Sequence, residues 1–131
     1  MSEFRTELKQ VRGLGSAHEG THHWWMQRIT AVALVPLSIW FVFFLEAIRG
    51  VDYLAVRYAI GQPMTAALML AYVCAVLHHA YLGVQVVIED YVHERVAEVG
   101  LLIATRLLFV LAALTATVSI LRLVFLAADP Q

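Results

Sequence analysis

Three long stretches of apolar residues, separated by short polar segments, organise this chain. They cover about residues 25–48, 64–88 and 101–126. A helix rises about 1.5 Å per residue, so roughly 20 residues cross a hydrocarbon core that is about 30 Å thick. Each stretch reaches that length. The pattern therefore predicts an all-α membrane protein with three transmembrane helices.

Proline and arginine residues refine the predicted spans. Pro36 lies within the first span, where a membrane helix tolerates proline with a kink. Gly61, just before Pro63, predicts a turn followed by a helix start at the proline. Arg106 and Arg122 are inset from the ends of the third span, and they fit a membrane helix if both side chains extend outward to the interfaces.

Composition supports the membrane assignment. The chain has 131 residues, of which 61% are hydrophobic and 15% are charged. Soluble domains average about half apolar and about a quarter charged residues. The length predicts a single membrane-anchor domain, residues 1–131. A net charge of -1 argues against a nucleic-acid partner. The single cysteine, Cys74, cannot form a disulfide within the chain.

Lysine and arginine predict the orientation, because cytoplasmic loops of membrane proteins are enriched in both. The N-terminal end of the chain and the head of the first span carry Arg5, Lys9, Arg12 and Arg28. The second loop carries Arg95. We therefore expect residues 1–23 to be a cytoplasmic segment. That segment has no apolar run typical of a cleavable signal peptide, so we expect a multi-pass protein of the bacterial inner membrane.

His79 is the most informative residue, because it lies near the middle of the second span. An imidazole is costly in a bilayer, so it marks a functional site by default. Neutral imidazole is the commonest metal ligand, and haem iron is often held by an axial histidine. At about 100° per residue, Ala75 and Gly83 lie about 40° to either side of His79. These small residues leave room for a porphyrin bound edge-on.

The same stripe has a second interpretation. Ala75 and Gly83 also fit a small-residue contact between helices, with His79 forming a hydrogen bond across it. His78 points about 100° away from His79, and it either bonds a neighbouring helix or competes as a ligand. Its neighbours form no comparable stripe of small residues, so we favour His79.

Asp90 and Tyr91 lie where the second span reaches the predicted cytoplasmic interface. Asp90 is within about 20° of the His79 stripe and about 16 Å further along the axis. A phenol can donate a hydrogen bond to a carbonyl oxygen and a carboxylate can relay protons, which together suit a quinone. Alternatively, Tyr91 anchors the interface and Asp90 simply ends the helix.

Arg28 enters the first span on the same predicted side as Asp90. A guanidinium makes bidentate contacts with carboxylates, so a haem propionate and Asp90 are both natural partners. The alternative is an arginine that extends toward lipid headgroups, as is common at the cytoplasmic side.

The second span resembles the second-helix signature of the hydrophobic membrane anchor subunit of succinate dehydrogenase, the D-type anchor of respiratory complex II. The matching residues are His79-Ala80-Tyr81-Leu82-Gly83, then Gln85, and then Asp90-Tyr91. The head of the first span, Gln27-Arg28-Ile29-Thr30-Ala31, is similar to the first-helix entry of the same family. The resemblance covers about the whole chain.

The resemblance implies a helical bundle shared with a companion cytochrome b-type anchor subunit. His79 would be one axial ligand of haem b, and the companion subunit would supply the other. Tyr91 and Asp90 would contribute to the ubiquinone site, with Arg28 near a propionate and the quinone. Flavoprotein and iron–sulfur subunits would dock on the cytoplasmic side, so the chain would not be an enzyme on its own. It would serve electron transport and the tricarboxylic acid cycle.

Three other functions remain open from the sequence. The chain could be a haem-free membrane adaptor, or the anchor of a related fumarate reductase. A small proton or solute transporter is a third possibility. The transporter interpretation is disfavoured because Glu46 and Glu89 lie only at span ends.

Overall fold

The computed structural model describes residues 17–128, which form four helices and no strand. They are α2 (Ala17–Ala47), α3 (Tyr53–Gly61), α4 (Pro63–Tyr91) and α5 (Arg95–Ala128). Three of them are long and apolar enough to cross a membrane, over His23–Ala47, Pro63–Tyr91 and Arg95–Ala127. The predicted all-α fold with three spans is therefore confirmed. Most of the predicted cytoplasmic segment, residues 1–16, lies outside the described residues.

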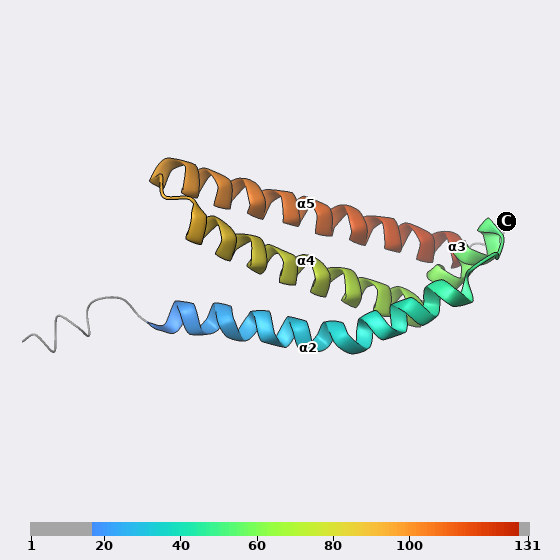
Figure 1. The fold of residues 1–131 in the computed structure, drawn as a ribbon. Helices are drawn as coiled ribbons and strands as arrows, with labels where there is room; N and C mark the ends of the chain where they lie inside the picture. Colours follow the sequence, from blue (N-terminus) through green and yellow to red (C-terminus); the bar gives the residue numbers. More distant parts are fainter. Residues whose placement is uncertain (1–16, 129–131) are drawn as a thin grey trace, which may run out of the picture.

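The helix boundaries follow local chemistry. The prediction that α4 starts at Pro63 is confirmed; proline suits this position because the first N–H groups of a helix have no partner within it. Pro36 lies inside α2, which continues through it as one bowed helix (Figure 1). The helix of the third span, α5, starts at Arg95, earlier than the predicted span start near residue 101. Glu98 lies in the first turn of this helix, where an acidic side chain interacts favourably with the helix dipole. It also forms an ion pair with Arg95 at 3.4 Å.

A short helix, α3, occupies the segment that the sequence analysis treated as a loop. The chain reverses direction at Gly50, whose φ of 72° lies in the left-handed region that glycine adopts readily. Within α3, Arg57 donates a hydrogen bond from Nη2 to the Leu126 carbonyl oxygen at 2.8 Å. This bond ties α3 to the last turn of α5.

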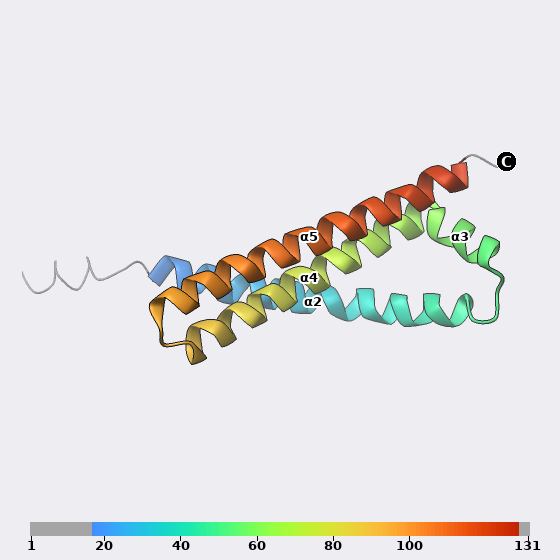
Figure 2. The same ribbon diagram turned by 90° about the horizontal axis from the view of Figure 1, so that it is seen from above.

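α4 is the central helix of the bundle. It contacts α2 on one side and α5 on the other, whereas α2 and α5 do not contact each other within residues 17–128 (Figure 1). The start of α2, the end of α4 and the start of α5 gather at one end of the molecule, and α3 lies at the opposite end (Figure 2). Neighbouring spans are therefore antiparallel. The residues around Arg28 share one end with Asp90 and Tyr91.

Aromatic pairs join α4 to both neighbours. Phe41 of α2 stacks on Tyr72 of α4 with ring centroids 4.7 Å apart. Tyr81 of α4 packs edge-on against Phe109 of α5, with centroids 5.9 Å apart. Pairs in these geometries are worth about 0.5–1.5 kcal/mol beyond the area that they bury. They hold the three spans in register.

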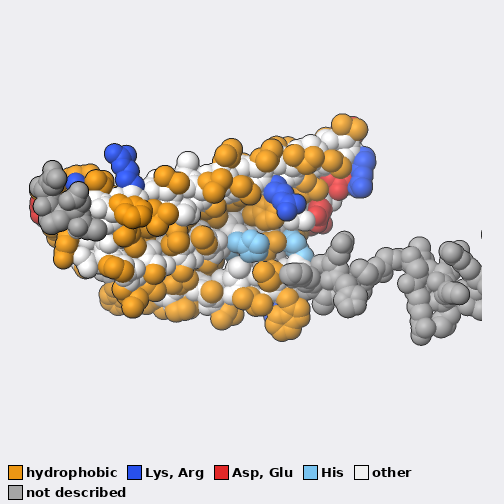
Figure 3. Space-filling view, turned by 180° about the vertical axis from the view of Figure 1, so that it is seen from behind, with side chains coloured by type: hydrophobic (Ala, Val, Ile, Leu, Met, Phe, Trp, Pro, Cys, Tyr) orange, Lys and Arg blue, Asp and Glu red, His pale blue; other side chains and the backbone are white. Residues whose placement is uncertain are grey.

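Very little of the apolar surface is covered by the chain itself. Among the described side chains only Ala66, Leu82, Ile88 and Ile120 are buried hydrophobics. The face seen in Figure 3 is dominated by hydrophobic side chains, with acidic and basic ones mostly toward its ends. Soluble monomers rarely expose apolar patches of this extent. A lipid environment therefore fits most of this surface.

Three hydroxyl groups in the second half of α5 are satisfied by the helix itself. Thr115 donates to the Leu111 carbonyl oxygen at 2.6 Å, Thr117 to that of Ala113 at 2.8 Å, and Ser119 to that of Thr115 at 2.7 Å. Unpaired polar groups cost several kcal/mol in hydrocarbon, so these bonds make the exposed helix compatible with lipid.

Gly61 is required where α3 meets α5. A Cβ at this position would lie 2.8 Å from the Leu123 carbonyl oxygen and would collide with the Ala127 Cβ. We expect Gly61→Ala to destabilise the protein by about 1–3 kcal/mol, as overpacking does. Gly100→Ala is the matched control, because nothing lies within 4 Å of a Cβ there. Near-UV circular dichroism during heating in mild detergent measures both; equal melting temperatures would contradict the expectation.

Candidate functional site

His79 lies on the side of α4 that faces α2. Its Nδ1 is 3.0 Å from Oγ1 of Thr30, and the residue is half-buried. One turn further along α4, a Cβ built on Gly83 would have Gln27 Nε2 of α2 as its nearest neighbour, at 4.0 Å. The hydrogen bond across two helices, proposed above as the packing interpretation of the stripe, is thus present. The neighbour of Gly83 is thus the amide end of the Gln27 side chain, at the distance of an ordinary van der Waals contact.

The second ring nitrogen of His79 is open. Nε2 makes no hydrogen bond within the described part of the chain, and it is not among the buried polar atoms that lack a partner there. An imidazole held at Nδ1 with Nε2 accessible has the arrangement of a metal-ligating histidine. No group of three or more potential metal ligands occurs among the described residues. The single open nitrogen of His79 would fit one axial position of a haem, because the porphyrin and a second subunit would supply the remaining ligands.

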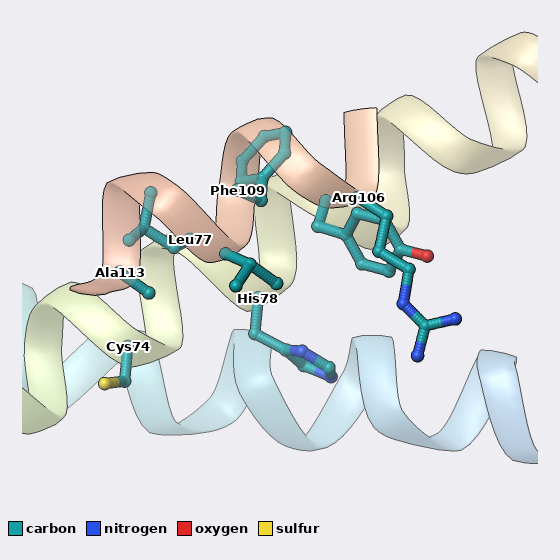
Figure 4. Close-up of a pocket in the computed structure, with 8 residues that line it drawn as sticks. Cys74, Leu77, His78, Arg106, Phe109 and Ala113 are labelled. Atoms are coloured by element: carbon teal, nitrogen blue, oxygen red, sulfur yellow. The ribbon is translucent and has the colours of Figure 1, made fainter. Parts of the chain in front are cut away.

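His78 faces a different groove. It is exposed and lines a cleft of about 460 Å³ between α4 and α5, together with Arg106, Tyr81 and Phe109 (Figure 4). In this view the side chains of His78 and Arg106 extend to the same side of the two helices. Neither makes a hydrogen bond or ion pair to another described residue. His78 is therefore the structural rival to His79 as a ligand.

Asp90 and Tyr91 end α4 in an exposed position. Tyr91 is 78% exposed, and the Asp90 carboxylate makes no hydrogen bond or ion pair with any other residue in the described range. The neighbouring carboxylate, Glu89, is already occupied by Gln85, whose amide donates to it at 2.8 Å. Both predicted quinone-site residues thus keep their polar groups available at the same end of the bundle.

Arg28 contacts the head of its own helix. Its Cζ lies 4.1 Å from the centroid of the Trp24 ring, one turn earlier in α2. A cation–π contact of this kind is worth about 0.5–1 kcal/mol at an exposed site. Residues 17–128 contain no ion pair between Arg28 and Asp90. The guanidinium remains exposed and can still bind an anion through its N–H groups.

The structure brings two residues to the site that the sequence analysis did not assign to it. Thr30 contacts His79, and Arg106 enters the cleft beside His78. Thr30 was quoted only as part of the first-helix resemblance, and Arg106 was interpreted only as a residue that extends to the interface. The signal for Thr30 was a hydroxyl in an otherwise apolar span, but its partner depends on how α2 and α4 are rotated.

Comparisons with known proteins agree on one family. The model of the succinate dehydrogenase/fumarate reductase transmembrane subunit matches residues 2–121. The chain is 36% identical to the succinate dehydrogenase hydrophobic membrane anchor subunit of Rickettsia bellii, covering 90% of this chain and 94% of the relative. The protein of the same name from Rickettsia typhi is 30% identical over the same shares. That from Paracoccus denitrificans is 34% identical, over 66% of this chain and 67% of the relative.

Proposed function

This chain belongs to the succinate dehydrogenase/fumarate reductase transmembrane subunit family, and we propose that it supplies one axial ligand of haem b and part of the ubiquinone site. The observation that carries the proposal is the state of His79: Nδ1 is held by Thr30 while Nε2 is open, in the middle of a membrane span. The relatives named as succinate dehydrogenase anchors favour succinate oxidation over fumarate reduction as the activity of the complex.

The haem site would be formed by one face of α4. His79 Nε2 would offer its lone pair to the iron, and the small residues Ala75 and Gly83 would leave space for the macrocycle on this face of α4. Arg28 would neutralise a propionate at the cytoplasmic end. Haem b, when bound, supplies a one-electron store beside the quinone. The second axial ligand would come from a companion cytochrome b-type anchor covering the exposed apolar helices.

The quinone site would lie at the exposed end of α4. The Tyr91 hydroxyl donates a hydrogen bond to a quinone carbonyl oxygen, which orients the ring and polarises that bond. The Asp90 carboxylate, free of any described partner and open to water, delivers protons to the reduced quinone. Electrons would arrive from iron–sulfur and flavoprotein subunits docked on this face, so this chain alone has no succinate-oxidising activity.

A haem-free adaptor is the second candidate, and the bond between His79 and Thr30 favours it as far as the bond serves packing. In that case the native complex would contain no b-type haem. A reduced-minus-oxidised spectrum of the native complex separates the two functions.

The orientation follows from the distribution of basic residues, and it sets the side on which the quinone site lies. We expect the C-terminus to face the periplasm and Asp90 to lie at the cytoplasmic face of the inner membrane. Alkaline phosphatase fused after Gln131 should be active, because the enzyme works only outside the cytoplasm. The same enzyme inserted at His93 should be inactive. The reverse pattern would overturn this orientation.

Replacing His79 tests the haem assignment. We expect His79→Ala to abolish or strongly weaken the reduced b-type absorption band of the purified complex, because no other described residue lies in the same place to bind iron. His78→Ala is the matched control and should keep a native band. A normal spectrum for His79→Ala would contradict the proposal, and loss of the band only in His78→Ala would move the ligand to the cleft between α4 and α5.

Replacing Tyr91 tests the quinone assignment. Tyr91→Phe removes one hydrogen bond, worth about 1 kcal/mol or more, so succinate:ubiquinone activity should fall about tenfold. Succinate oxidation by a soluble dye should be unchanged, because that reaction does not use the quinone site. Tyr53→Phe, in α3 at the opposite end of the bundle, should affect neither rate. Equal losses of both activities in Tyr91→Phe would count against a role in quinone binding.

A further inference from the structure

The hydroxyl of Thr30 has three polar neighbours but only one proton. Its Oγ1 lies 2.9 Å from the Met26 carbonyl oxygen, 2.9 Å from that of Gln27 and 3.0 Å from His79 Nδ1. Carbonyl oxygens only accept hydrogen bonds, so the Thr30 proton must be directed at one or both of them. If it were directed at His79 instead, Oγ1 would face two carbonyl oxygens at hydrogen-bond distance with no proton between them.

This constraint determines the tautomer of His79. With the Thr30 proton committed to the backbone of α2, only the lone pairs of Oγ1 remain for the imidazole. Nδ1 must then carry the proton and donate it to Thr30. In a neutral imidazole the proton on Nδ1 leaves a lone pair on Nε2. That is the nitrogen with no partner among the described residues.

We propose that Thr30 is a positioning residue for the haem ligand: it accepts the Nδ1–H of His79, fixes the ring orientation and keeps the Nε2 lone pair ready for iron. This inference rests on the proposed role of His79 and goes beyond it, because it assigns a residue on a different helix. A hydrogen-bond acceptor at the distal nitrogen also raises the basicity of a metal-ligating histidine. Thr30 therefore tunes the iron as well as orienting the ring.

The backbone contacts of Thr30 explain why a threonine suits this position. A hydroxyl that bonds back to the preceding turn satisfies its own donor and is held in one rotamer. Its oxygen is then presented outward as an acceptor, in a bilayer region where no water competes. A carboxylate would do the same more strongly, but at the cost of placing a charge in the span.

Thr30→Val provides the test, because valine keeps the shape of threonine and loses the hydroxyl. In the purified complex we expect haem binding to weaken about ten- to a hundredfold, measured as haem transfer to excess apomyoglobin. The haem midpoint potential should rise, because a less basic imidazole stabilises the ferric state less. Thr30→Ser, which restores the acceptor, should return both properties toward the native values.

A matched control is available on α5. Thr117 is also partly buried, but the only side-chain hydrogen bond it makes within residues 17–128 is to its own helix at Ala113. Thr117→Val should therefore leave haem binding and potential unchanged. If Thr30→Val does not assemble, Thr30→Ala removes the hydroxyl without a branched side chain against α4, and it is compared with Thr30→Ser in the same way.

The outcomes separate this inference from the proposed function. Native haem binding and potential in the hydroxyl-free Thr30 variants, with His79→Ala lacking haem, would overturn the role of Thr30 alone. A native spectrum in His79→Ala would overturn the ligand assignment itself. Weakened haem binding and a raised potential in Thr30→Val, both rescued by Thr30→Ser, would support the inference.

Discussion

A polar group inside a hydrocarbon layer needs a partner, and this constraint determines how the chain is built. Thr115, Thr117 and Ser119 of α5 meet it locally, each by donating to a carbonyl oxygen of the preceding turn. An imidazole has two ring nitrogens, and it finds its hydrogen-bond partners outside its own helix. His79 therefore depends on α2 for one nitrogen, and the bond to Thr30 leaves the other nitrogen unsatisfied. An unsatisfied nitrogen at this depth is compatible with the membrane when iron or another partner binds it.

The central position of α4 allows one helix to serve packing and chemistry together. Adjacent residues on a helix point about 100° apart, so two consecutive histidines enter different grooves. His79 is directed to α2 and His78 to the cleft shared with α5. The aromatic contacts to Phe41 and Phe109 fix α4 on both sides. The rotation of α4, and with it the direction of each imidazole, is thereby determined by packing against both neighbouring helices.

The sequence was sufficient for features that depend on local chemistry. Hydropathy predicted the three spans, and the position of Pro63 predicted where α4 begins. The contact of Arg28 with Trp24 is also local, since residues four apart on a helix are neighbours, but it was not predicted. The helix α3 was missed because its nine residues are fewer than a membrane span requires, and because its bond from Arg57 to Leu126 joins distant parts of the chain. The partner of His79 was missed for the same reason, since it depends on the packing of two helices.

The arrangement of the spans also fits the proposal that this chain provides one part of a haem site shared with another subunit. Because α2 and α5 do not meet within the described residues, α4 is the one described span that contacts both of the others. The apolar side chains are mostly exposed, and just four of those described are buried hydrophobics. The proposed haem at His79 would then need a second subunit to cover the side that these helices leave exposed. A lone open imidazole nitrogen on a helix that is fixed from both sides is what such a shared site requires from each contributing subunit.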